Sequence, residues 1–135
     1  MIEYRIGKDG LDVDAVIEVY RASRLGALRP IEDRPRMERM MTHANLVVSA
    51  WDGALLVGVA RSLSDFAFCT YLADLAVRAE FQRRGIGREL IRQTRAVGGE
   101  AIVFLFAAPE AVRYYPHLGF RQGSGWSLPS TFPLR

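Results

Sequence analysis

The 135-residue sequence has few of the residues that stabilise or anchor several common kinds of protein. Cys69 is its only cysteine, so no internal disulfide can form. Its two histidines, His43 and His117, lie far apart and have no cysteine cluster near them, so we expect no metal cofactor. No apolar run approaches the roughly 20 residues that cross a bilayer, and residues 1–10 lack the apolar core of a signal peptide. We therefore expect a cytoplasmic protein with no membrane partner.

Lysine is also scarce, since Lys8 is the single lysine among 18 basic residues and the others are arginines. A net charge of +3 and a hydrophobic fraction of 50% are typical of a globular protein, and we expect a single domain over residues 1–135. Domains that bind nucleic acid have a stronger and more concentrated basic stripe, so we expect no nucleic-acid partner. The positive charge is densest from Arg78 to Arg95, beside glycines, which favours a small phosphate-bearing ligand.

The apolar pattern predicts a mixed α+β sheet with helices on its faces, in the order β–α–α–β–β–β–α–β–α–β. Asp52-Gly53 joins two apolar runs and predicts a hairpin turn. A nearly continuous apolar run at 101–108 predicts a buried strand parallel to its neighbour. The expected strands are 1–7, 45–51, 54–64, 67–77, 101–108 and short strand material within 120–129; the expected helices are 12–24, 36–44, 85–99 and 109–119.

A glycine turn, "QRRGIG" at residues 82–87, lies between an expected strand and an expected helix. A nucleotide phosphate loop needs Lys-Ser/Thr after its last glycine, but Arg88-Glu89 follows Gly87. A dinucleotide fingerprint needs a third glycine at position 90, which is Leu90. The remaining possibility is a pyrophosphate held by consecutive backbone N–H groups at the helix N-terminus, with basic side chains beside it.

Two motifs carry a family resemblance. "QRRGIG" resembles the acyl-CoA pyrophosphate loop of the GCN5-related N-acetyltransferase (GNAT) superfamily. "AVRYYPHLGF" at 111–120 resembles the signature of that family's fourth helix. The resemblance extends over residues 45–120, with Ala79 where the family often has proline. It implies the acyl-CoA N-acyltransferase fold, a central mixed and mostly antiparallel sheet with one splayed parallel strand pair and about four helices.

The resemblance also implies acetyl-CoA as the co-substrate. Its pantetheine arm would lie between the strands at 67–77 and 101–108 and pair with the backbone of the first. One backbone N–H there would stabilise the oxyanion. The residues that the resemblance assigns to cofactor binding are Leu75, Ala76, Val77, Gln82, Arg83, Arg84, Gly85, Ile86, Gly87, Arg88 and Tyr114.

The implied reaction is direct attack of an amine on the thioester, which needs one proton donor and one proton acceptor. Tyr115 matches the family tyrosine that faces the sulfur, and we assign it as general acid. Asp74 is our candidate base, directly or through water, and Tyr71 and Glu32 are alternatives. Because strand residues alternate between faces, we expect Asp74 to lie on the face of Leu72 and Ala76.

The expected function is therefore an acetyl-CoA-dependent N-acetyltransferase for a small-molecule or protein amine. The alternative is a non-catalytic acyl-CoA-binding sensor. We also raise the hypothesis that Trp126 and Phe132 pack in a homodimer interface. The sequence does not identify the amine, but the first two helices and neighbouring segments are expected to shape its pocket. The residues concerned are Tyr20, Arg24, Arg29, Glu32, Met37, Met41 and Phe66.

Overall fold

The computed structural model describes residues 1–135, which divide into two compact units. The first unit is Met1–Leu105 and the second is Phe106–Arg135. We describe each unit by itself. The expectation of a single domain stays a prediction.

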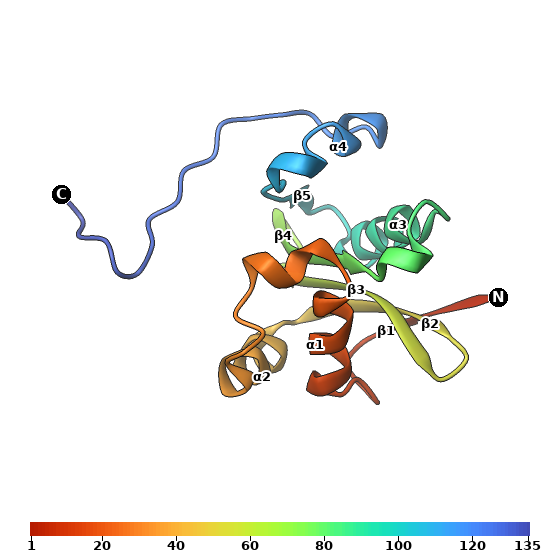
Figure 1. The fold of residues 1–135 in the computed structure, drawn as a ribbon. Coiled ribbons are helices and arrows are strands. Elements are labelled where there is room, and N and C mark those ends of the chain that lie inside the picture. The colour runs from red at the N-terminus through yellow and green to blue at the C-terminus, as the bar shows by residue number, and fades with distance from the viewer. The chain divides into compact units, whose positions relative to one another are not determined.

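The first unit is a five-stranded sheet in the order β1-β2-β3-β4-β5 with helices on both faces (Figure 1). The first four strands pair antiparallel, and β4 pairs parallel with β5. This arrangement confirms the predicted mixed α+β class. The elements are β1 (Ile2–Ile6), α1 (Val13–Arg21), η1 (Arg24–Leu28), α2 (Arg34–His43), β2 (Leu46–Asp52), β3 (Leu55–Ser64), β4 (Cys69–Val77), η2 (Ala79–Phe81), α3 (Ile86–Gly98) and β5 (Ile102–Phe104).

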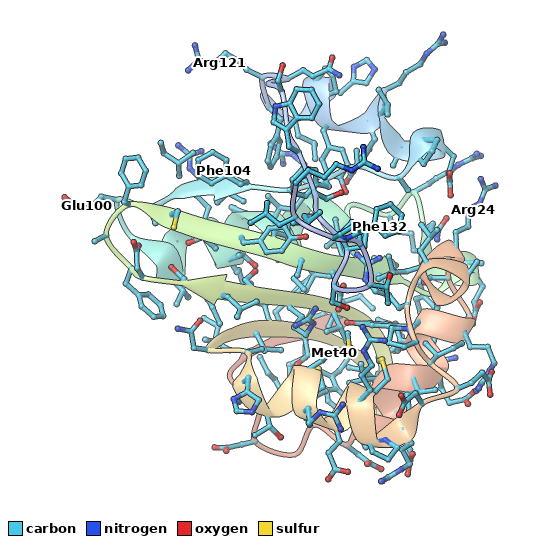
Figure 2. The ribbon with its side chains drawn as sticks, turned by 90° about the vertical axis from the view of Figure 1, so that its left-hand side faces the viewer. Arg24, Met40, Glu100, Phe104, Arg121 and Phe132 are labelled. Carbon is cyan, nitrogen blue, oxygen red and sulfur yellow. The ribbon has the colours of Figure 1, made fainter.

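The helices α1 and α2 cover one face of the sheet and enclose the main core. Asp12 begins α1, because its carboxylate accepts the backbone N–H of Asp14 at 3.1 Å. Side chains of both helices fill the layer against the sheet, and Met40 on α2 is labelled there in Figure 2. The buried cluster consists of Val16, Ile17, Val19, Tyr20, Met37, Met41, Ala44, Val47, Trp51, Leu56, Val59 and Ala76.

Helix α3 lies close against the opposite face. A Cβ added to Gly58 of β3 would stand 3.1 Å from Leu90 Cδ1, and one added to Gly98 would stand 2.8 Å from Thr70 Oγ1. Glycine at both positions therefore lets α3 approach the sheet closely. This contact fixes the N-terminus of α3 beside the end of β4, where the glycine turn of the sequence lies.

A β-bulge interrupts β4 in its middle. Arg61 pairs with Asp74 and Ser62 pairs with Leu72, so Ala73 has no partner on β3. Because of this extra residue, even-numbered side chains before and after the bulge lie on opposite faces of the sheet. Thr70 contacts Gly98 of α3, whereas Asp74 binds Tyr20 of α1. Asp74 shares its face with Ala76, as expected. The expectation that it also shares a face with Leu72 is wrong, because simple alternation does not continue through a bulge.

Strand β5 differs from its prediction in length and burial. It spans three residues rather than the eight of 101–108, and Ile102 and Phe104 are 53% and 48% exposed. It is the last strand in the sheet order and pairs along one edge only. The apolar run therefore did not signal burial on both faces, although the predicted parallel pairing is confirmed.

The second unit contains η3 (Pro109–Ala111), α4 (Tyr114–His117) and an irregular C-terminal segment. The predicted helix at 109–119 is thus two short helical pieces. The predicted strand material within 120–129 is wrong, since no strand forms there. Gly123, Gly125 and Pro129 weaken strand formation, and no neighbouring strand pairs with this segment.

Candidate functional site

The segment between β4 and α3 has the backbone of an anion-binding turn. Arg83 and Gly85 both have left-handed φ values, +64° and +81°. A non-glycine residue in this region is uncommon and is often found at functional sites. The Gln82 side chain holds the start of the turn, donating to the Val77 carbonyl at 2.9 Å. Left-handed residues at alternate positions direct successive N–H groups into a concave nest for an anion.

The first turn of α3 supplies further donors. Gly85 is the N-cap and provides no side-chain cap, and Glu89 N–H donates to Gly85 C=O at 3.0 Å. The N–H groups of Ile86, Gly87 and Arg88 therefore stay unpaired at the positive end of the helix dipole. The exposed guanidinium of Arg84 lies 4.9 Å from the Phe81 ring centroid.

Glu89, the acidic residue in the first turn of α3, is hydrogen-bonded to side chains of the same helix. Hydrogen bonds from Arg92 at 2.7 Å and from Gln93 at 2.9 Å hold the Glu89 carboxylate. They lower its pKa to about 2, with Arg92 the larger cause. Hydrogen bonds within the helix therefore occupy this carboxylate, and the turn keeps its positive character.

The edge of β4 beyond the bulge is open to a ligand backbone. Strand β5 pairs with β4 only over Cys69–Tyr71. The Arg78 N–H donates toward β3, to Val57 C=O at 2.9 Å. Because backbone groups of an antiparallel strand alternate in direction, those of Leu75 and Val77 point away from β3, with Ala76 between them. This is the arrangement that strand addition by an amide-bearing ligand requires.

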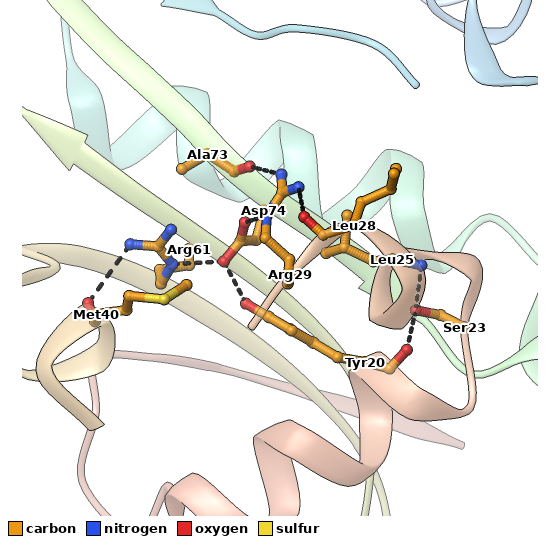
Figure 3. Close-up of polar contacts among 9 residues, drawn as sticks. All are labelled: Tyr20, Ser23, Leu25, Leu28, Arg29, Met40, Arg61, Ala73 and Asp74. Atoms are coloured by element: carbon orange, nitrogen blue, oxygen red, sulfur yellow. Dashed lines mark hydrogen bonds and ion pairs between the residues drawn. The ribbon is translucent and has the colours of Figure 1, made fainter. Parts of the chain in front are cut away.

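Beside this edge, a buried carboxylate is held by three side chains (Figure 3). Asp74 Oδ2 accepts from Tyr20 Oη at 2.7 Å and from Arg61 Nε at 2.5 Å. Its Oδ1 accepts from Arg29 Nε at 2.5 Å, and Arg29 Nη2 also donates to the carbonyl of the bulged Ala73 at 2.7 Å. The side chain of Asp74 has no exposed surface.

The partners decide the protonation state of this cluster. Burial by itself would raise the pKa of Asp74, but the hydrogen bond and charge of Arg61, with Tyr20 and Arg29, lower it below its usual value. Burial and the Asp74 charge raise the pKa of Tyr20 well above its usual value. The cluster is therefore an ionised carboxylate, a neutral phenol and two guanidinium groups, with a net charge of +1.

The sequence analysis named Tyr20, Arg29 and Asp74 separately but missed Arg61 and the contacts among them. The sequence nevertheless contained a signal for this contact. Arg61 and Asp74 are charged residues within apolar strands, and a charge on such a strand needs a partner. What the sequence could not supply was the register that pairs these two positions across β3 and β4.

The other candidates for the acceptor pocket are dispersed. Met37 and Met41 belong to the core, at 0% and 8% exposure. Glu32, with its side chain 86% exposed, has Arg21 at 3.5 Å as its ion-pair partner. Phe66 lies in the turn between β3 and β4, and Arg24 begins η1.

In the second unit, Tyr115 lies between two other aromatic rings. Its ring centroid is 5.2 Å from that of Tyr114 and 5.5 Å from that of Phe120, both in edge-on geometry. Burial, and then the charge of Tyr114, raise the pKa of Tyr115 above its usual value. Its hydroxyl is therefore protonated at neutral pH.

No His, Cys, Asp and Glu side chains gather in a group of three or more that could hold a metal ion. None of the helices is long and apolar enough to cross a membrane.

A model of the acetyltransferase (GNAT) domain matches residues 23–125. The chain therefore belongs to the GNAT family of N-acetyltransferases, as the two sequence motifs indicated. The fold agrees: a GNAT-family acetyltransferase of Streptococcus pneumoniae superposes with a TM-score of 0.80 at 24% identity, over 98% of this chain and 100% of that one. An aminoglycoside N-acetyltransferase in complex with CoA gives 0.74 at 14% identity, over 97% and 95%.

Curated relatives are similar over part of their length. An uncharacterised N-acetyltransferase of Porphyra purpurea is 30% identical over 68% of this chain and 55% of its own length. A chloroplastic serotonin N-acetyltransferase of Oryza sativa is 31% identical over 86% of this chain and 60% of its own length. Across the curated relatives, the match covers from 26% to 60% of the relative's own length.

Proposed function

We propose that the protein is an acetyl-CoA-dependent N-acetyltransferase that acts on a primary amine. The observation that carries the proposal is the turn from Gln82 to Arg88, where two left-handed residues precede an uncapped helix N-terminus. Its N–H groups and exposed arginines fit a pyrophosphate. Acetyl-CoA would supply the acetyl group as a reactive thioester.

The residues of the open β4 edge would hold the pantetheine arm. Leu75 offers its N–H and C=O there and Val77 its N–H, because the Gln82 side chain already occupies the Val77 carbonyl. A free N–H on this edge would stabilise the oxyanion of the attacked thioester. Ala76 packs in the core beneath this segment. Tyr114 would form a wall against the cofactor, as its match to the family signature suggests.

In the reaction, the amine nitrogen attacks the thioester carbon, the C–N bond forms and the C–S bond breaks. Tyr115 would give its hydroxyl proton to the departing sulfur, so that CoA leaves as a thiol. The Tyr115 hydroxyl is protonated at neutral pH, as this role requires, while burial, which raises its pKa, makes it a weaker acid than an exposed tyrosine.

The proton lost by the amine needs an acceptor, and Asp74 as that base stays a prediction. Its lowered pKa and three hydrogen-bond donors make it a weak base. We propose that its larger contribution is to hold Arg29 and Arg61 at the bulge while the amine proton passes to water. The variant Asp74→Asn, developed in the Discussion, distinguishes the two roles.

The first experiment is a thermal melt of the protein with and without acetyl-CoA. Ligand at 100 times its dissociation constant stabilises the folded state by about 2.7 kcal/mol, which raises Tm by several degrees. ATP is the control, because it carries phosphates but no pantetheine arm. A shift with acetyl-CoA and little with ATP is expected. No shift at millimolar acetyl-CoA would refute the proposed function.

The proposal extends to assembly and location. Trp126 and Phe132 are 92% and 63% exposed, and Phe132 is labelled in Figure 2. Two exposed aromatic side chains in one segment support the homodimer hypothesis. Light scattering after size exclusion is expected to give a dimer mass, and a monomer at micromolar concentration contradicts it. We keep the cytoplasm as the proposed location, and imaging of a tagged chain tests it.

A further inference from the structure

The outer surface of α3 carries a row of three exposed arginines, Arg88, Arg92 and Arg95, which we call the arginine row. At 3.6 residues per turn these positions fall within an arc of about 60°, and the row is about 10 Å long. It continues the basic surface of the anion-binding turn, where Arg83 and Arg84 are also exposed. Five exposed arginines therefore follow one another from the turn along the helix.

The chain neutralises little of this positive charge. Arg92 forms an ion pair with Glu89 at 2.7 Å. The other four arginines of this surface form no ion pair. Five arginines and one glutamate leave a net charge of +4 on this set of residues.

The arrangement opposes the local preferences of a helix. Arg88 lies in the first turn of α3, where the positive end of the helix dipole favours acidic side chains. It is also four residues from Arg92, a spacing at which like charges repel. Local preferences that are broken without a gain inside the chain are typical of functional sites. An anionic partner from outside the chain would remove the repulsion.

The length of the row favours a protein partner over a small phosphate compound. A pyrophosphate at the turn lies at the N-terminus of α3, whereas Arg95 lies in its last turn. Ten residues separate Gly85 from Arg95, which is about 15 Å along the helix. Charges at positions i, i+4 and i+7 match acidic side chains with the same spacing on a second helix.

The position of the row indicates which side of the reaction such a partner serves. Helix α3 covers the sheet face opposite to α1 and α2 (Figure 1). The Asp74 cluster faces α1, so a partner on α3 approaches from the phosphate end of the donor site instead. Pantetheine thioesters occur on CoA and also on acidic helical carrier proteins, where a phosphodiester joins the arm to a serine. A carrier therefore brings a phosphate and an acidic surface together.

We propose that the arginine row docks an acidic carrier protein that holds an acetyl group on a phosphopantetheine arm. The inference rests on the proposed function, because the arm would enter the same donor site, with its phosphodiester at the turn and its amides along the open edge of β4. The amine nitrogen attacks the thioester carbon, the C–N bond forms and the C–S bond breaks. The arm leaves as a thiol that stays attached to the carrier.

The test measures binding of a purified, acetyl-loaded acyl carrier protein to the full chain by fluorescence anisotropy. Binding is expected, and it should weaken as NaCl is raised from about 0.05 M to about 0.5 M, because salt screens exposed charges. The same carrier without its arm should bind about 100-fold more weakly, since the arm and the docking surface act together. No binding of the loaded carrier, or equal binding of both forms, would overturn the proposal.

Arg95→Glu is the diagnostic variant, because Arg95 is exposed and lies outside the proposed cofactor contacts. The reversal replaces an attraction by a repulsion and should raise the Kd of the carrier about 2- to 30-fold, twice the worth of one exposed ion pair. The acetyl-CoA melting shift should not change. Arg39→Glu makes the same charge change on an exposed position of α2 and should leave carrier binding nearly unchanged. Equal weakening by both variants would reveal an effect of net charge alone and contradict the docking role.

A DNA duplex of mixed sequence is the second probe. Duplex binding that Arg95→Glu abolishes, together with no binding of the carrier, would assign the row to nucleic acid and overturn the proposal. Absence of any acetyl-CoA shift in the unaltered protein refutes the acetyltransferase itself. A normal acetyl-CoA shift without carrier binding overturns only the docking surface.

Discussion

Replacing Asp74 by asparagine is expected to destabilise the fold strongly. The substitution keeps the size of the side chain but removes its charge, leaving Arg29 and Arg61 without their shared counter-ion. Breaking a buried ion pair by removing one partner costs about 3–5 kcal/mol. For a chain of this length that lowers Tm by roughly 10–18 °C. Tyr20→Phe removes one charged hydrogen bond and should cost less, about 1.5–3 kcal/mol.

The assay is urea unfolding at several pH values, followed by circular dichroism, with Asp9→Asn as an exposed control. The folded-state pKa of Asp74 is lowered, so its stabilisation is fully present above its unfolded pKa of about 3.9. It is lost as pH falls through the folded-state pKa. The difference between the unaltered protein and Asp74→Asn should therefore be constant near neutral pH and shrink below about pH 4.

The same variant separates anchoring from catalysis. If Asp74 mainly holds the arginines, Asp74→Asn lowers stability while acetyl transfer by the folded protein keeps its acidic limb in the pH profile. If it is the base, acetyl transfer falls steeply while unfolding changes by less than about 1 kcal/mol, and the pH profile of kcat/KM loses its acidic limb. The second result would refute the reasoning from the buried cluster.

Three further changes test other parts of the structure. Tyr115→Phe removes the proposed acid and should lower kcat about 100-fold or more with the acetyl-CoA dissociation constant nearly unchanged; an unchanged kcat excludes the role. Gly58→Ala forces a Cβ to within 3.1 Å of Leu90 and should cost about 1–3 kcal/mol in urea unfolding, and a neutral result would mean that α3 shifts freely. Arg83→Gly relieves a left-handed φ of +64°, worth about 1–2 kcal/mol, but increases the entropy of the unfolded chain by about 0.4–1 kcal/mol, so stability should rise by no more than about 1 kcal/mol. The same change should raise the acetyl-CoA dissociation constant, measured by calorimetry; unchanged affinity would remove this side chain from the pyrophosphate site.

Local sequence signals predicted much of the fold because their physical causes are local. Asp52-Gly53 forms the expected hairpin turn, where Gly53 adopts a φ of +59°. The helix expected at 85–99 is α3, and its buried face includes the expected Ile86, Leu90, Ile91 and Thr94. The anion-binding turn was predicted from the spacing of its glycines and from the neighbouring arginines. All of these residues lie within one short segment of the chain.

The errors arose where a residue's surroundings come from distant segments. Residues 101–108 are apolar throughout, yet β5 is short and exposed because it is the edge strand. Residues 120–129 form no strand, because a strand needs a neighbour and none pairs with them. A rule in which strand residues simply alternate between the two faces does not predict the bulge at Ala73.

Motif spacing and short-range backbone preferences are local properties of the chain, and they specify the family, the order of most elements and the position of the anion turn. The surroundings of Asp74 depend instead on tertiary contacts. The pairing of β3 with β4 places Arg61 beside it, and α1 and the segment after η1 bring Tyr20 and Arg29 to the same point. The protonation state and the net charge of the cluster depend on that convergence, which no local pattern contains.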